Sequence, residues 1–165
     1  PEFARRGSEF RVGARALYVL SPGEDADILG RGTGDGFFVV YHPEDPGQIE
    51  GDVFFEVVLE RSAHVEIGTG RAAEYWRGFA GFRWSDEWSE HSEPFLSAGA
   101  SYSRIEVSGG DVIGGLGLYG GAGVEFVFAR VVAATIEAKV HRFWGGDESA
   151  GGSALVLAAA VGMRF

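Results

Sequence analysis

The sequence of 165 residues contains no cysteine. Disulfide bonds, zinc sites built from thiolates and a cysteine nucleophile are therefore excluded. Basic residues are also scarce, because 14 Lys and Arg stand against 24 Asp and Glu and leave a formal net charge of -10. Affinity for nucleic acid comes largely from basic side chains that neutralise phosphates. We therefore expect no nucleic-acid partner.

Long apolar runs are missing as well. The longest uncharged apolar stretch, 154–163, is about half of the roughly 20 residues that a membrane-spanning helix needs. The opening PEFARRGSEF carries charges but lacks the apolar core that defines a signal peptide. We expect no helical span, a signal peptide that has been removed, and an N-terminal tail or vector remnant at residues 1–8.

Glycine and aromatic residues are abundant instead. The chain has 27 glycines and 13% aromatic residues, a combination that suits tight turns and close-packed strands better than helices. Its length fits one domain, which we place at residues 9–165. The composition therefore indicates a single all-β domain.

Apolar residues recur at every second position through most of the chain. In the segment 9–20 every even position is apolar, which is the period of a β-strand with one apolar face. The segment GFFVVY, 36–41, could be a ninth strand; we place it in the first loop as a hairpin arm, because an even strand count returns both chain ends to the same side. The pattern predicts eight strands, at 9–20, 52–60, 64–70, 75–84, 94–103, 116–128, 132–144 and 155–165.

The predicted connections alternate in length. Long connections are expected at 21–50, 70–74, 106–114 and 145–152, and short ones at 61–63, 86–93 and 129–131. Bacterial outer-membrane barrels have this asymmetry, with short periplasmic turns and longer outer loops. The predicted fold class is all-β, an eight-stranded antiparallel up-and-down transmembrane β-barrel.

Two kinds of eight-stranded barrel share this alternation. A soluble barrel of the lipocalin kind points its apolar face inward around a small apolar ligand, whereas a membrane barrel points it at lipid. Large aromatic residues lie near both ends of the predicted strands, as expected where rings meet the two membrane interfaces. The predicted belts comprise Tyr18, Trp76, Tyr102 and Trp144 beside the long connections, and Trp84 and Phe128 at the opposite ends.

The other face of the strands carries charges of both signs in similar number. A solvated outer surface would explain them, but we favour a paired network inside a closed barrel, whose interior is just wide enough for side chains. The predicted interior residues are Arg11, Arg15, Glu56, Glu60, Arg77, Arg83, Glu125, Glu137, Lys139, His141 and Arg164.

The chain ends on AAAVGMRF, in which Met163 and Val161 precede Phe165 at alternate positions. This ending resembles the terminal strand of bacterial outer-membrane barrels. The segments GGAGVEFVF and TIEAKVHRFWGGD resemble the penultimate hairpin of small barrels related to OmpA, OmpX and OmpW. The resemblance covers about residues 92–165. It implies that Phe165, Met163 and Val161 form a signal read by the barrel-insertion machinery.

Little in the sequence suggests catalysis. Lipid A deacylases of this architecture place a His and a Ser two residues apart near the outer end of the seventh strand, but here His141 is followed at that distance by Phe143. Without that hydroxyl the histidine has no nucleophile to activate. We expect no enzyme, and interpret His141 as an interior residue paired with Glu137 or Glu125. The remaining histidines lack metal-ligand spacing, so neither a metal nor a cofactor is expected.

The sequence thus predicts a closed, monomeric, non-porin barrel of the bacterial outer membrane, acting as a structural element or through its outer loops. The expected partners are outer-membrane lipid, lipopolysaccharide and the insertion machinery. The connection 21–50 is the expected contact surface, with acidic residues that are either solvated or bridged to lipopolysaccharide by divalent cations. The alternatives are a soluble barrel for an apolar ligand and a lipid A-modifying enzyme.

Overall fold

The computed structural model describes residues 8–20, 31–43, 52–66, 72–85, 91–107, 109, 112–129, 131–145 and 151–165. Within these ranges the chain forms strands, and no helix is long and apolar enough to cross a membrane. The strands are β1 (Glu9–Leu20), β2 (Arg31–His42), β3 (Asp52–Glu66), β4 (Ala72–Ser85), β5 (Ser92–Val107), β6 (Val112–Ala129), β7 (Val132–Gly145) and β8 (Gly151–Arg164).

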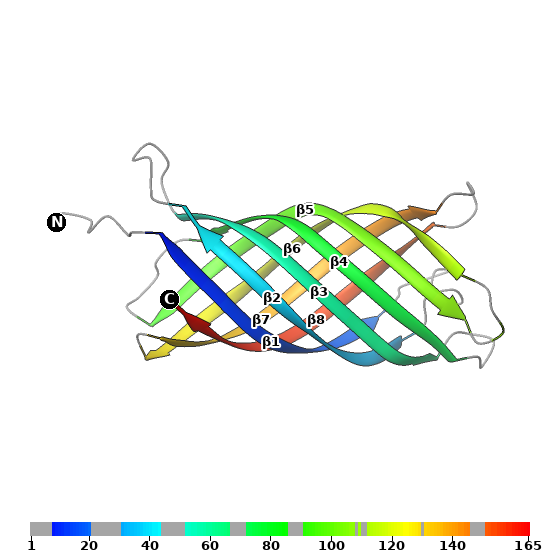
Figure 1. The fold of residues 1–165 in the computed structure, drawn as a ribbon, viewed down its shortest axis with the longest axis horizontal. Coiled ribbons are helices and arrows are strands. Elements are labelled where there is room, and N and C mark those ends of the chain that lie inside the picture. The colour runs from blue at the N-terminus through cyan, green and yellow to red at the C-terminus, as the bar shows by residue number, and fades with distance from the viewer. Residues whose placement is uncertain are drawn as a thin grey trace.

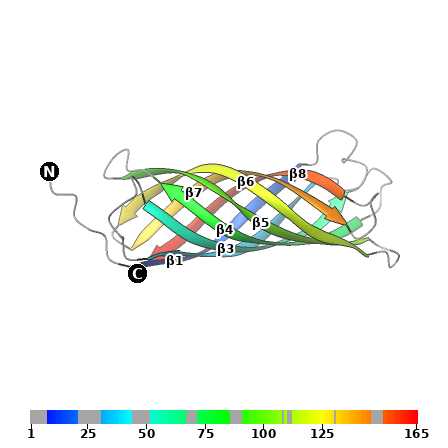
Figure 2. The ribbon, with the colours of Figure 1, turned by 90° about the horizontal axis from the view of Figure 1, so that it is seen from above.

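The eight strands form one closed barrel in which each pairs antiparallel with its sequence neighbours, and β8 pairs with β1 (Figures 1 and 2). The predicted fold class is therefore confirmed. The strands lie oblique to the barrel axis, as closure of a barrel requires. A row of paired residues that starts at Arg11 on β1 and follows the register from strand to strand reaches Ala154 on β8. The residue next to Ala154 pairs with Leu20, so the row returns to the opposite end of β1. The start of β1 and the end of β8 lie at the same end of the barrel, called here the termini end (Figure 1).

The strand count is correct, but two of the predicted strands are wrong. Residues 31–42 form β2 and are not part of a loop, and the segments predicted as separate strands, 52–60 and 64–70, belong largely to the single strand β3. The segment RGTGDG hides β2, because its outward positions hold the polar Arg31, Thr33 and Asp35 and its inward positions hold glycines. A Cβ at Gly34 would lie 2.8 Å from Ser62 Oγ, and one at Gly36 would lie 3.2 Å from Glu60 Cγ. The apparent break in β3 is an irregularity between Ser62 and Val65.

The predicted alternation of long and short connections is also wrong. At the termini end the strands are joined by 43–51, 86–91 and 130–131, and at the opposite end, called here the far end, by 21–30, 67–71, 108–111 and 146–150. The connection 43–51 is nearly as long as 21–30, since β2 divides the predicted loop 21–50 into two parts.

The two faces of the barrel wall differ sharply in character. Large apolar side chains point outward, with Leu116 72% and Ile136 63% exposed, whereas the interior holds charged residues such as Lys139 at 0% and Glu60 at 1%. This arrangement is the reverse of a soluble barrel, whose apolar side chains surround an interior ligand. The face predicted to be apolar is therefore the outer one.

Candidate functional site

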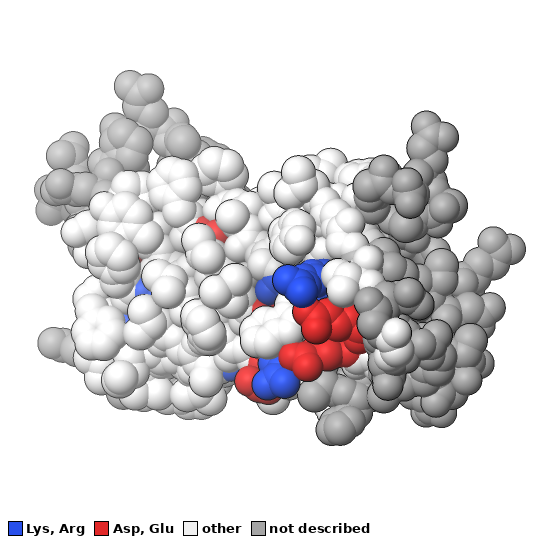
Figure 3. Space-filling view, turned by 45° about the vertical axis from the view of Figure 1, so that its right-hand side comes forward, with Lys and Arg blue, Asp and Glu red and all other residues white. Residues whose placement is uncertain are grey.

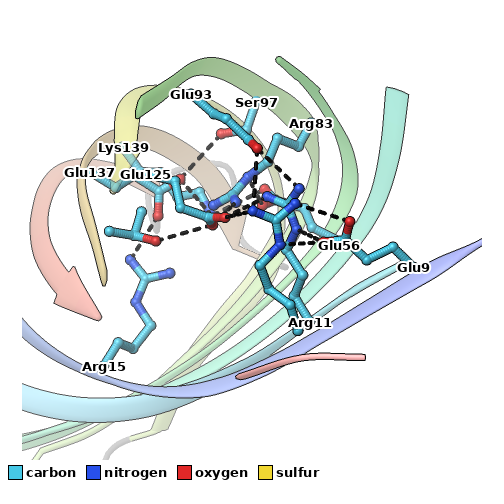
Figure 4. A network of polar contacts seen from close by, with 12 residues as sticks. Glu9, Arg11, Arg15, Glu56, Arg83, Glu93, Ser97, Glu125, Glu137 and Lys139 are labelled. Atoms are coloured by element: carbon cyan, nitrogen blue, oxygen red, sulfur yellow. Dashed lines mark hydrogen bonds and ion pairs between the residues drawn. The ribbon is translucent and has the colours of Figure 1, made fainter. Parts of the chain in front are cut away.

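The barrel interior contains a continuous series of ion pairs in which acidic and basic residues alternate (Figure 4). We call it the ion-pair chain. Its members come from β1, β3, β4, β6 and β7, so it connects opposite sides of the wall. In order they are Glu9, Arg11, Glu125, Arg83, Glu56, Lys139, Glu137, Arg15, Glu60 and Arg77.

Arg11 organises the part of the ion-pair chain nearest the termini end. Its guanidinium contacts Glu9 at 2.6 Å, Glu125 at 2.7 Å and Glu93 at 3.0 Å, and it lies 4.3 Å above the centre of the Phe54 ring. Planar guanidinium groups suit this role because they donate several hydrogen bonds in fixed directions. Arg164, only partly buried, contacts the same three carboxylates, Glu9 at 2.8 Å, Glu93 at 3.3 Å and Glu125 at 4.0 Å.

In the middle of the barrel each charge is shared between two partners. Lys139 Nζ lies 3.1 Å from Glu56 and 3.2 Å from Glu137. Arg15 lies 3.0 Å from Glu137 and 3.2 Å from Glu60. Such pairing is required for buried charges, since an unpaired ion in the interior costs several kcal/mol.

The ion-pair chain ends at Arg77, whose guanidinium contacts Glu60 at 3.2 Å and donates a hydrogen bond to Ser62 Oγ at 2.7 Å. Toward the far end the interior becomes apolar. A cluster of buried side chains from five strands fills it: Leu17, Val19, Ala73, Tyr75, Ile105, Phe143, Ala154, Val156 and Ala158. The described interior thus holds paired charges in its middle and apolar side chains toward the far end.

His141 lies at the boundary between these two parts of the interior. It is fully buried, its Nε2 is 3.4 Å from Tyr75 Oη, and the Phe79 ring meets it edge-on. The expected pairing with Glu137 or Glu125 is wrong, because Lys139 and the arginines occupy those carboxylates. Phe143, at the position where the deacylases have serine, is a buried member of the apolar cluster.

Small residues on the inner face make room for the large ones. A Cβ at Gly81 would lie 2.6 Å from the Tyr119 hydroxyl, which donates a hydrogen bond of 2.7 Å to Glu56. A hollow lined by Arg15 and Glu56 has a volume of about 10 Å³, close to the minimum for one water molecule. Small residues thus let the large side chains pack closely around it.

Sequence reasoning missed several interior polar residues, among them Glu93 and Tyr119. Glu93 was overlooked because the predicted fifth strand began at residue 94, although Glu93 shares its parity with the inward-facing Phe95 and Ser97. Tyr119 was placed on the polar face but not recognised as a partner of Glu56, since only the closed barrel brings β3 and β6 to a common interior.

The residues of the two aromatic belts all point outward. Trp84 and Phe128 lie toward the termini end with exposed fractions of 41% and 71%, together with Phe10 and Phe165. Tyr41 and Phe55 lie there too: the Phe10 and Tyr41 rings are 4.6 Å apart, and those of Phe55 and Phe82 are 5.1 Å apart. Toward the far end the exposed rings are those of Tyr18, Trp76, Tyr102 and Trp144.

Charged side chains appear on the outer wall beyond this second belt. Figure 3 shows them grouped in one area, next to a wide area that is nearly free of charge. Near the far ends of β3, β4 and β5, Arg61 pairs with Glu74 and Arg104 with Glu106, each at 2.7 Å and each between a third and a half exposed. The Arg61 guanidinium also lies 5.2 Å from the centre of the Trp76 ring. The apolar band of the wall therefore stops at the second belt on this side of the barrel.

The last strand closes the barrel against the first. Phe165 N donates to Phe10 O at 2.8 Å, and Phe10 N donates to Phe165 O at 3.1 Å. Val161, Met163 and Phe165 all point outward, with 61%, 51% and 71% of each side chain exposed. The backbone of Phe165 is thus held in the sheet while its ring faces the surroundings.

Comparison of folds matches the chain to solved outer-membrane proteins over almost its full length. Neisserial surface protein A shares 14% identity with a TM-score of 0.64, covering 98% of this chain and 99% of that one. The Ail protein of Yersinia pestis, solved with the heparin analogue sucrose octasulfate, shares 15% identity with a TM-score of 0.60, covering 96% and 97%. The N-terminal barrel of Pseudomonas aeruginosa OprF shares 13% identity with a TM-score of 0.60, covering 94% and 97%.

This is the fold of a small outer-membrane β-barrel. No family model matches the sequence, and no curated protein matches it. The likeness to the solved barrels therefore concerns the fold. Within the part of the chain that the structure describes, no group of three His, Asp or Glu side chains could hold a metal ion.

Proposed function

We propose that this protein is a closed barrel of the bacterial outer membrane, which acts as a structural element of the membrane or through its extracellular loops. One observation carries the proposal: the buried ion-pair chain fills the interior, while large apolar side chains face outward. In water such a wall would expose far more apolar surface than a monomeric soluble protein tolerates. In lipid the same wall is stable, because every backbone polar group inside the apolar band is paired within the closed sheet.

A closed interior argues against transport through the barrel. Wide barrels of many strands enclose water-filled channels, whereas eight strands leave room for side chains alone. Here the side chains on the path are paired ions such as Lys139 with Glu56, followed by the apolar cluster that contains Phe143. The proposal is thus a non-porin barrel, in which the described hydroxyl beside His141 is the phenol of Tyr75 and not a serine.

The proposal also assigns an orientation and partners. We place the termini end in the periplasm, because the final strand, with the proposed insertion signal, ends there at Phe165; the lengths of the connections do not distinguish the two ends. Phe165, Met163 and Val161 serve the insertion machinery, since their outward side chains are available on the final strand. Lipid and lipopolysaccharide cover the wall of a monomer. Of the acidic residues in the predicted loop 21–50, only Asp35 lies within the described residues, and it is on β2.

The test is whether the purified chain requires an apolar solvent to fold. We expect it to fold in detergent or lipid vesicles, to migrate differently on gels before and after boiling, and to give no steady conductance across a planar bilayer. A chain that is monomeric and β-rich in buffer without detergent would refute the membrane assignment. Folding in lipid accompanied by stable conductance would refute the closed barrel alone.

A further inference from the structure

The outer wall is hollowed on one side of the barrel. A shallow apolar hollow of about 840 Å³ crosses β1, β8, β7 and β6. Small residues form its floor: Ala16, Ala159, Ala138 and Ala122. Tyr18 and Leu157 lie at its edge toward the far end, and Phe126 lies at its edge toward the termini end, so that the hollow extends over most of the height between the two aromatic belts.

The opposite side of the wall is bulky. There β2, β3 and β4 present Phe37, Phe55, Leu59 and Phe82, each with about half of its side chain exposed. A barrel can close and present apolar side chains to lipid without a hollow on either side, because a hollow wall and a bulky wall both contact lipid. The hollow is therefore a feature of shape that the fold alone does not explain.

Arg142 lies on the same side of the wall, beyond the hollow toward the far end. It is an exposed outward residue of β7, between Val140 and Trp144, four residues from Ala138 and thus about 13 Å along the strand. Among the described residues it has no ion pair, and neither has the outward Arg31 on β2, whereas the outward arginines Arg61 and Arg104 each bind a carboxylate at 2.7 Å. An unpaired guanidinium at the level of the aromatic belt lies where lipid headgroups meet the protein.

We propose that the hollow and Arg142 together bind one anionic lipid, with an acyl chain in the hollow and the headgroup phosphate on the Arg142 guanidinium. The proposal rests on the membrane location proposed above. The apolar floor matches an acyl chain that runs along the barrel, and guanidinium forms paired, charge-assisted hydrogen bonds with phosphate oxygens. The distance from Ala138 to Arg142 matches the step from the acyl region to the headgroup.

A second copy of the chain fits this side less well. A symmetric pair in a membrane is related by an axis along the membrane normal, so residues at equal height meet across the interface. Two copies joined through the hollow would bring their Arg142 side chains together at one level without a described counter-ion. A phosphate instead supplies the missing negative charge.

The proposal can be tested by native mass spectrometry, which measures how much lipid binds to the folded chain in a neutral detergent. The probes are phosphatidylglycerol, which is anionic, and phosphatidylcholine with the same acyl chains, which is zwitterionic. Arg142→Gln should weaken phosphatidylglycerol binding about tenfold and abolish the preference over phosphatidylcholine. The matched control Arg104→Gln removes an outward arginine that already has a carboxylate partner, and should change neither value.

A second pair of variants tests the hollow. Ala138→Leu with Ala159→Leu fills its floor and should weaken binding of both lipids, whereas Ala100→Leu, outward but outside the hollow, should not. Equal binding by Arg142→Gln and Arg104→Gln, unchanged binding after filling, or a lipid-free dimer would overturn the proposal. The gel shift on boiling, measured for each variant, separates these results from a failure of the membrane barrel itself.

Discussion

Removal of Lys139 should destabilise the barrel more than removal of any exposed charge. Its Nζ is fully buried and lies 3.1 Å from Glu56 and 3.2 Å from Glu137. In Lys139→Met, Glu56 keeps Arg83 at 3.7 Å and Glu137 keeps Arg15 at 3.0 Å, so neither carboxylate becomes fully isolated. We therefore expect a loss of about 3 kcal/mol, the lower end of the cost of breaking a buried pair.

The assay is equilibrium unfolding by urea in lipid vesicles, followed by tryptophan fluorescence. With a slope of about 1–3 kcal/mol per molar urea, the midpoint should fall by about 1–3 M. Arg104→Met is the control, because Arg104 and Glu106 are about half exposed and such pairs contribute under about 1 kcal/mol.

A double variant shows whether Lys139→Met destabilises the barrel by leaving an excess of buried negative charge or by the loss of side-chain packing. Lys139→Met with Glu137→Gln removes one charge of each sign, and Arg15 still has Glu60 at 3.2 Å. We expect the double variant to be more stable than Lys139→Met alone, because the two sites are in direct contact and their effects do not add. If Lys139→Met costs no more than Arg104→Met, the ion-pair chain does not stabilise the barrel.

Three further predictions concern the wall, the interior and assembly. Ile136→Arg, in the apolar band, should lower the free energy of unfolding in vesicles by about 2–4 kcal/mol, whereas Leu116→Arg, near the belt, should lower it by about 0–1 kcal/mol. Equal losses for the two variants would contradict the assignment of Ile136 to an apolar band inside the membrane. Gly81→Ala should lower the folded fraction seen by gel shift, because its Cβ would lie 2.6 Å from Tyr119 Oη, whereas Gly120→Ala should not, with no atom nearer than 3.9 Å. Phe165→Ala should reduce insertion in cells but not refolding in detergent, unlike the equally exposed Phe128→Ala.

The residue pattern predicted most strands because each has one apolar face with a period of two. It failed at residues 31–42, where the outward face begins with the polar Arg31, Thr33 and Asp35 and the inward face with glycines 32, 34 and 36. Gly34 and Gly36 are explained only by their neighbours in space, Ser62 and Glu60, which need the room. The break predicted near residues 61–63 has a similar origin, since the register shifts there while the strand continues.

The sequence by itself determined that the chain is all-β, that its strands are two-faced and that charges of both signs share one face, because side-chain alternation is a local property of a strand. The tertiary structure decided which face is outside, since inside and outside exist only once β8 pairs with β1. It also decided the partners of each charge. Glu56 meets Lys139 and Tyr119, and Arg11 meets Glu125, because closure brings residues far apart in the sequence to one narrow interior.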